Sequence, residues 1–162
     1  MSSKLFFDPM TLFRVAPLVT ASFSVCFSWD QQFFLQNFLH PTTRSKIDGI
    51  LPAYFDTFFR AGLPRVLVLF TTSTALGIAN AVTGKPNTSR FYVAGAVLSA
   101  AHYLFVPWVM YPIRAIVHNE SHGRSSEDLE KWLGVHTTRT LLVDVPAWAC
   151  FFLAILGAVR AV

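Results

Sequence analysis

Long apolar runs decide what this chain can fold into. Several of them approach or exceed about 20 residues, the length with which an α-helix crosses a hydrocarbon core about 30 Å thick. Of the 162 residues, 53% are hydrophobic and only 14% are charged, and the mean hydropathy is +0.47. This composition excludes an ordinary soluble domain. The sequence therefore predicts an all-α fold, a polytopic membrane four-helix bundle.

Breaker residues divide the apolar runs into four helices of one transmembrane domain, residues 1–162. We expect helices at about 10–39, 62–82, 89–118 and 127–158. Asp8 suits the N-cap of the first helix, and Gly84 followed by Pro86 ends the second. The aromatic, amphipathic segment 50–60 either lies along the membrane surface or extends the second helix downward.

The charges favour lipids over nucleic acid as partners. Thirteen Lys and Arg give a net charge of +4, but they are scattered among loops and helix ends and form no basic stripe with interleaved aromatics. Cations at the ends of apolar runs contact lipid head groups. Four helices enclose little interior for a bulky ligand, so a homo-oligomer with a shared site is an alternative to a monomer. No small-residue cleavage site follows the first run, so we expect an integral protein of the endoplasmic reticulum.

The start of the fourth helix carries one group of candidate catalytic residues. His136 and Arg139 are three residues apart and therefore share a helix face, with Trp132 one turn earlier on the same side. An imidazole acts as acid or base near neutral pH, and a guanidinium holds a developing oxyanion. The alternative is that both residues are interfacial and contact head groups.

Two further ionisable residues lie inside apolar runs. Asp144 needs a partner in the membrane, and Arg139 or a histidine on the third helix is the natural candidate. His102, followed by Tyr103, lies well inside that third helix. The alternatives are a structural ion pair for Asp144 and an interhelical hydrogen bond for His102.

Two other polar features are weaker candidates. Asp30, with its neighbouring amides on the first helix, faces either the protein interior or the membrane interface. His118 and His122 have the four-residue spacing of a metal pair, but Gly123 follows at once and no third ligand is evident. We therefore expect no metal site.

The order of these features resembles the small four-helix membrane family that includes the fungal anthrone oxygenases of polyketide pathways. The resemblance covers nearly the whole chain and rests on three motifs. They are Tyr54-Phe-Asp56 through Arg60-Ala-Gly62-Leu-Pro64, then Val106-Pro107-Trp108-Val-Met110-Tyr-Pro112, then Leu129-Glu-Lys-Trp132 through His136-Thr-Thr-Arg139. Family members typically have Pro-x-Asn late in the third helix. Here Pro112 is followed by Ile113 and Arg114, and the nearest asparagine is Asn119.

The resemblance implies a reaction that needs no metal or flavin, hence no cofactor. A base removes an activated proton from the substrate, and the carbanion reacts with oxygen. His136 or His102 would be the base, and Arg139 would hold the oxyanion, with Asp144 as a further catalytic residue. The residues expected to bind substrate are Trp108, Tyr111, Trp132, Asp30, Tyr103 and Asn119.

The leading hypothesis is a membrane enzyme of specialised metabolism that oxygenates a lipophilic, aromatic or polyketide-derived substrate. A cyclase or isomerase using the same acid and base groups without oxygen is the second hypothesis. A third, from a different class, is a non-catalytic membrane scaffold or carrier. Loss of activity in a His136→Ala variant that still assembles would separate an enzyme from a scaffold.

Overall fold

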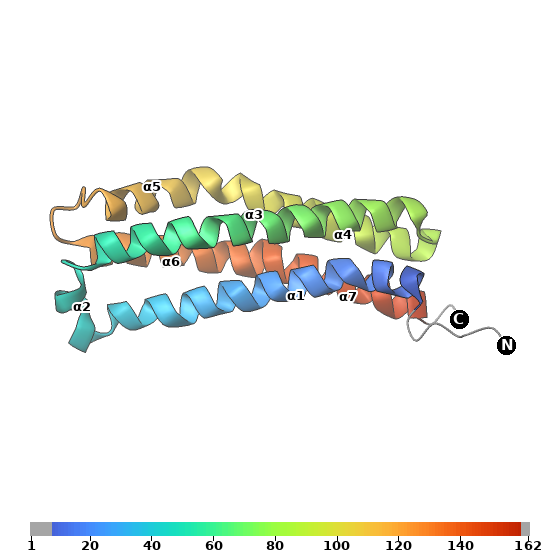
Figure 1. Ribbon diagram of the computed structural model, residues 1–162, viewed down its shortest axis with the longest axis horizontal. Coiled ribbons are helices and arrows are strands. Elements are labelled where there is room, and N and C mark those ends of the chain that lie inside the picture. Colours follow the sequence, from blue (N-terminus) through green and yellow to red (C-terminus); the bar gives the residue numbers. More distant parts are fainter. Residues whose placement is uncertain (1–7, 160–162) are drawn as a thin grey trace.

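The computed structural model describes residues 8–159, which form four long helical rods packed side by side (Figure 1). The first rod is α1 (Pro9–Gln36) with the short 3-10 turn η1 (Asn37–Leu39), and the second is α3 (Leu51–Thr83). The third consists of α4 (Pro86–Ala101), η2 (His102–Phe105) and α5 (Val106–Val117). The fourth consists of α6 (Ser125–Arg139), η3 (Thr140–Asp144) and α7 (Val145–Val159). The described residues contain no strand, which confirms the all-α prediction.

Local sequence explains where the rods begin. Asp8 caps α1 by accepting hydrogen bonds from the backbone N–H groups of Met10 (3.2 Å) and Thr11 (3.1 Å), and Pro9 opens the helix. The Thr11 hydroxyl also donates to Asp8, and this bond lowers the pKa of the carboxyl. The segment 50–60 belongs to α3, so it continues the second rod instead of lying apart from it.

The expected polar connection after the first rod is itself helical. Pro41 opens α2 (Pro41–Ile47), and the His40 side chain accepts a hydrogen bond from the Thr42 N–H (3.4 Å). The Thr43 hydroxyl donates back to the carbonyl of Asn37 (2.8 Å), which ties α2 to the end of the first rod. These local capping bonds let a polar stretch fold as a helix.

Two rods contain an irregular turn, and each turn lies just before a proline. Pro107 has no N–H for the carbonyl of Tyr103, and η2 ends with a Val106 N–H bonded to that carbonyl instead. Pro146 likewise has no N–H for the carbonyl of Leu142, and η3 is a π-turn in which the Val145 N–H bonds to the Thr140 carbonyl. The second proline of the third rod, Pro112, lies inside α5 without interrupting it.

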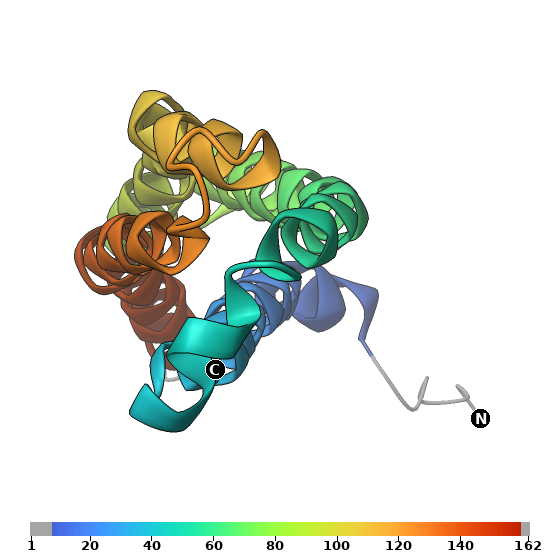
Figure 2. The same ribbon diagram turned by 90° about the vertical axis from the view of Figure 1, so that its left-hand side faces the viewer.

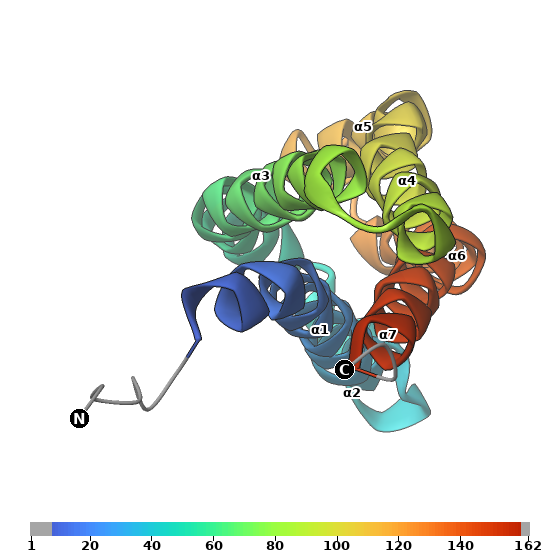
Figure 3. The ribbon, with the colours of Figure 1, turned by 90° about the vertical axis from the view of Figure 1, so that its right-hand side faces the viewer.

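Viewed along the rods, the four helices surround a common axis (Figures 2 and 3). Their outer surface is apolar: Phe23, Val68 and Val82 are 63%, 64% and 80% exposed. The interior contains many polar side chains, among them Ser24, Ser28, Gln31, Ser73, Asn80 and Ser99. A soluble bundle has the opposite distribution, whereas helices in lipid pack through small and polar residues.

Four segments are long and apolar enough to cross a membrane. They are Pro9–Leu39, Leu51–Thr83, Pro86–Val117 and Ser125–Ala158. Polar bonds join them: Ser73 donates to the Thr20 hydroxyl (2.8 Å), and Asn80 donates to the Phe13 carbonyl (3.0 Å). The helices therefore have the length, outer surface and interior of a membrane bundle.

Two apolar clusters fill the ends of the bundle and leave its middle to polar groups. The cluster at the α2 end consists of Leu35, Leu51, Phe55, Ile113, Ile116, Leu129, Trp132 and Leu133. The cluster at the other end consists of Ala21, Tyr92, Phe151 and Ala154. There α4 and α7 approach closely, because a Cβ on Gly95 would lie 2.5 Å from Phe151 Cε1.

Candidate active site

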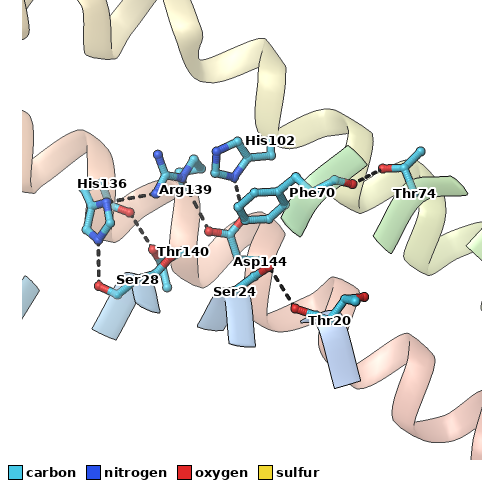
Figure 4. A network of polar contacts seen from close by, with 10 residues as sticks. All are labelled: Thr20, Ser24, Ser28, Phe70, Thr74, His102, His136, Arg139, Thr140 and Asp144. Carbon is cyan, nitrogen blue, oxygen red and sulfur yellow. Dashed lines mark hydrogen bonds and ion pairs between the residues drawn. The ribbon is translucent and has the colours of Figure 1, made fainter. Parts of the chain in front are cut away.

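Four ionisable side chains meet in the middle of the bundle, between the two apolar clusters (Figure 4). We call His102, His136, Arg139 and Asp144 the polar network. All four are buried, with exposures of 1–7%. These are the four residues predicted from the sequence as catalytic, and the structure brings them together from the third and fourth rods.

Asp144 lies at the centre of the polar network because both of its oxygens are bonded. Its Oδ1 lies 3.0 Å from His102 Nδ1, and its Oδ2 accepts a hydrogen bond from Arg139 Nε (3.4 Å). A carboxylate only accepts, so the proton of this pair is on Nδ1 of His102. The Nε2 atom of His102 then carries the lone pair, in the tautomer in which a histidine acts as a base through Nε2.

Local geometry places these partners. His102 is the first residue of η2, and Asp144 is the last residue of the π-turn η3. The two irregular turns therefore lie beside one another and present their polar side chains across the bundle. The ring of Phe70 stacks on His102 at a centroid distance of 3.6 Å, which covers one face of the imidazole.

His136 is held in a different way, with both ring nitrogens engaged. Its Nε2 lies 2.9 Å from the carbonyl oxygen of Ser28 on α1, and its Nδ1 lies 2.9 Å from Arg139 Nη2. A carbonyl and a guanidinium have fixed roles, so Nε2–H donates and Nδ1 accepts. The ring also stacks on Trp132 at 4.7 Å. His136 therefore positions Arg139, and it has no free lone pair with which to take a proton.

A cavity of about 120 Å³ adjoins the polar network and is lined mainly by apolar side chains. Its apolar wall includes Phe58, Phe59, Leu63, Val66, Met110 and Ile113. Polar atoms come from His102, Arg139, Tyr103 and Gln31. His136 is not part of this lining; it borders a smaller space beside Ser28 and Trp29.

Two nitrogen atoms of the polar network are left for a ligand. Neither His102 Nε2 nor Arg139 Nη1 has a hydrogen-bond partner among the described residues, and neither is a fully buried atom. Both belong to side chains that line the cavity. Side chains that line the cavity thus carry one unbonded basic nitrogen and one unbonded cationic donor group.

The other predicted residues are divided between the cavity and the surface. Trp132 and Tyr103 line the cavity, and their role in substrate binding stays a prediction. Trp108 and Tyr111 are 61% and 69% exposed on the outer surface, and Asp30 is exposed as well.

Asn119 lies in the connection between α5 and α6. Its φ is 50°, and its side chain accepts a hydrogen bond from the Gly123 N–H (2.9 Å). That bond shapes the connection. Because Asn119, like the three surface residues, does not line the cavity, their role in substrate binding stays a prediction.

Gln31 is a polar cavity residue that was not among the predicted site residues. It is 8% exposed and lines the cavity, whereas its neighbour Asp30, the predicted residue, faces outward. The helical period holds the signal, because Ser24, Ser28 and Gln31 are spaced four and three residues apart and share the buried face of α1. Small residues on a membrane helix mark the side that faces its neighbours.

The described residues contain no group of three or more His, Cys, Asp or Glu side chains that could hold a metal. His118 and His122 lie at the α2 end, where α5 gives way to the connection, and His122 has a φ of 50°. A continuous helix with both rings on one face, on which the metal spacing depends, therefore does not extend across them.

Fold and site together define a class: an all-helical bundle of membrane-length helices with a buried His–Asp–Arg network beside an apolar cavity. Within that class, the chain is 27% identical to epoxidase pydX of Acremonium sp over an alignment of 155 residues, which covers 93% of this chain and 96% of the relative. It is 28% identical to probable epoxidase scpX of Mollisia scopiformis, over 91% of this chain and 96% of the relative.

A third relative, oxaleimides biosynthesis cluster protein N of Penicillium oxalicum, is 28% identical over 94% of this chain and 92% of the relative. No family model matches the chain, and the search of solved structures found no significant match. These names support an oxygenase-like enzyme of fungal secondary metabolism, the coarser form of the sequence prediction. None of the three supports cyclisation or isomerisation.

Proposed function

We propose that this chain is a membrane-embedded enzyme that adds oxygen from O₂ to a lipophilic small molecule, as an epoxidase or related oxygenase. One observation carries the proposal. The two nitrogens that the polar network leaves unbonded, His102 Nε2 and Arg139 Nη1, belong to side chains lining an apolar cavity. The names of the relatives supply the reaction class.

His102 is the base in this proposal. Its Nε2 takes a proton from an acidic C–H or O–H group of the substrate, and Asp144 stabilises the imidazolium that forms because it accepts the hydrogen bond from Nδ1 (3.0 Å). The surrounding apolar wall keeps water away, which strengthens the effect of each charge. His136 has both nitrogens engaged, so it is a positioning residue.

Arg139 stabilises negative charge. Its Nε and Nη2 groups are fixed by Asp144 and His136, so Nη1 is a preorganised donor toward the cavity. The charge appears first on the deprotonated substrate and then on the oxygen that it reduces. A guanidinium keeps its proton throughout, so it serves as a donor in both steps.

A route without a cofactor balances if the substrate supplies the electrons. The substrate anion gives two electrons to O₂, a C–O bond forms, and protonation gives a hydroperoxide. The O–O bond then breaks in one of two ways. Either water leaves and a carbonyl remains, or the outer oxygen adds to a neighbouring double bond as an epoxide and an alcohol remains. Both outcomes consume one O₂ and no external reductant. Cofactor independence is the part of the proposal that rests on the resemblance to anthrone oxygenases.

The test uses membranes containing the protein and the compound that accumulates in cells lacking it. The compound is incubated under ¹⁸O₂, under ¹⁶O₂ and under nitrogen, with and without added NADPH. The masses of the products are then measured by mass spectrometry. We expect a product that carries heavy oxygen only under ¹⁸O₂ and that forms without NADPH. A product of unchanged mass formed equally under nitrogen would overturn oxygenation in favour of cyclisation or isomerisation. A strict need for NADPH would remove the cofactor-free route alone.

A further inference from the structure

A second hollow, which we call the outer hollow, lies next to the cavity between α3 and α5. Its volume is about 390 Å³. Phe59, Leu63, Met110 and Ile113 line both spaces, so one shared wall separates them. The remaining lining of the outer hollow is charged or polar on one side: Asp56, Arg60, Arg114 and His118, together with Val117.

The lengths of the helices place the two spaces at different depths. At a rise of about 1.5 Å per residue from the end where α1 begins, Trp29 lies about 30 Å along α1, and Trp108 lies about 33 Å along the third rod. Both are exposed tryptophans, which favour the edge of the hydrocarbon core, and about 30 Å is the thickness of that core. The membrane edge therefore falls near these two residues.

The same count places the polar network inside the edge and the outer hollow beyond it. Asp144 and His102 lie about 22 and 24 Å along their rods, within the hydrocarbon. Arg60 lies about 35 Å along α3, and Arg114 lies about 42 Å along the third rod, both at the level of the lipid head groups. On the same count the shared wall extends from the membrane edge at Leu63, about 30 Å along α3, to the level of the arginines at Ile113, about 41 Å along the third rod.

The outer hollow contains more donors than acceptors. Arg60 donates through Nε to Asp56 (2.9 Å), and Arg114 donates through Nε to Glu120 (2.8 Å). The Nη groups of both arginines and the ring of exposed His118 have no hydrogen-bond partner among the described residues. Guanidinium Nη groups bind carboxylates and other planar anions well.

We propose that the substrate is an elongated amphiphile that enters between α3 and α5, with an acidic end held by Arg60 and Arg114 and an apolar body reaching the cavity. This proposal rests on the proposed function, since it names the substrate class for that site. The acidic end, a carboxylate or an acidic enol, stays among the head groups. The reacting part of the substrate lies about 10–18 Å from the acidic end. The lower figure is the helical rise of α3 from Arg60 to Leu67, and the upper figure is the rise of the third rod from His102 to Arg114.

A binding experiment tests this without turnover. The protein is placed in nanodiscs of phosphatidylcholine, and cis-parinaric acid, a fluorescent long-chain carboxylate, is titrated and followed by energy transfer from tryptophan. Its methyl ester is the uncharged probe. We expect the acid to bind at least about tenfold more tightly than the ester, because its charge-assisted hydrogen bonds are lost in the ester.

Matched variants locate the effect. Arg60→Gln with Arg114→Gln should remove the preference for the acid. Arg124→Gln should keep it, because Arg124 is an exposed, ion-paired arginine at the same end that does not line the outer hollow. Leu63→Phe, which adds bulk to the shared wall without changing charge or adding a tryptophan donor, should weaken both probes. Equal binding of acid and ester to the unaltered protein, or a preference that survives in the double variant, would overturn the proposal.

A second experiment tests whether the arginines bind the acidic end of the substrate or the phosphate group of a lipid. The titration is repeated in nanodiscs that contain phosphatidic acid. If the arginines serve only to hold lipid phosphate, this lipid abolishes the preference for the acid, and the proposal fails. If the preference persists, the pocket recognises the acid itself. Because binding is measured without oxygen consumption, failure here leaves the oxygenation test untouched, and the reverse also holds.

Discussion

His102 and His136 look alike in the sequence, since each lies in an apolar run near a tryptophan or tyrosine. Their hydrogen bonds separate them. His136 uses both nitrogens to join the Ser28 carbonyl to Arg139, whereas His102 uses one nitrogen for Asp144 and keeps the other for the cavity. Residue type and spacing were enough to predict the four members of the polar network. The division of roles was beyond the sequence, because it depends on a backbone carbonyl of α1.

Glutamine should replace His136 with little loss. Its amide N–H can donate to the Ser28 carbonyl and its oxygen can accept from Arg139, as the two ring nitrogens do. We expect His136→Gln to keep turnover within roughly tenfold. His136→Leu should lose most of it, because leucine makes neither bond and leaves the Arg139 Nη2 group without a partner. Turnover and thermal unfolding of both variants in nanodiscs provide the measurement. If the glutamine variant were as inactive as one lacking the base, His136 would be more than a positioning residue.

Glutamine should fail at His102. It can still bond Asp144, so the ion pair with Arg139 survives, but an amide cannot accept a proton at neutral pH. We expect His102→Gln to lower kcat by about 10²–10⁴-fold, with a thermal unfolding temperature close to that of the unaltered protein. His122→Asn, which changes an exposed histidine at a position with φ of 50° where asparagine is well tolerated, is the control. Normal turnover in His102→Gln would exclude this histidine as the base.

At the scale of elements, length and hydropathy predicted the four rods. They did not predict the irregular turns that orient the side chains of the site. Of the two prolines of the third rod, Pro107 and Pro112, only Pro107 follows an irregular turn, a difference that residue type alone does not reveal. The π-turn η3 and the short helix α2 had no clear signal, because a π-turn depends on packing across the bundle and α2 on capping bonds to Asn37 and His40. Asp144 ends that π-turn, so the missed element is one that builds the site.

Pro146 should favour the π-turn η3 over a regular α-helical turn. Replacing it with alanine restores an N–H that can bond to the Leu142 carbonyl, and a regular α-turn would then compete with η3. We expect Pro146→Ala to unfold at the same or a higher temperature while turnover falls by about tenfold or more, because Asp144 turns away from His102. Pro112→Ala is the control, since Pro112 lies in an uninterrupted helix. Lower stability with unchanged turnover would show that the π-turn does not set the position of Asp144.

At the scale of the whole molecule, the apolar outside and polar inside decide the environment. Each rod has an apolar side chain that is 62–80% exposed and would promote aggregation in water: Phe23, Val82, Val97 and Leu142. Ser73, Asn80 and Trp148, by contrast, find partners inside the bundle. The sequence could predict this inversion because the four apolar runs leave too few polar residues for an outer face. It could not predict which polar residues pair across rods, since those contacts join positions more than fifty residues apart.

Depth in the bilayer provides the test at this scale. Trp148 on α7 lies about 16 Å from the end of its helix, near the centre of a hydrocarbon core about 30 Å thick, whereas Trp108 lies at its far edge. In variants that keep only one of these two tryptophans and carry phenylalanine at the other tryptophan positions, lipids brominated near the end of the acyl chain should quench Trp148 more strongly. Lipids brominated near the head group should quench exposed Trp108 more strongly. If the same lipid quenched both residues more strongly, the membrane edge would not lie at Trp108. The outer hollow would then not lie in the head-group layer. If instead each tryptophan shows the order expected of it, the polar network lies in the hydrocarbon and Arg60 and Arg114 lie among the head groups. An amphiphile with one acidic end requires that arrangement.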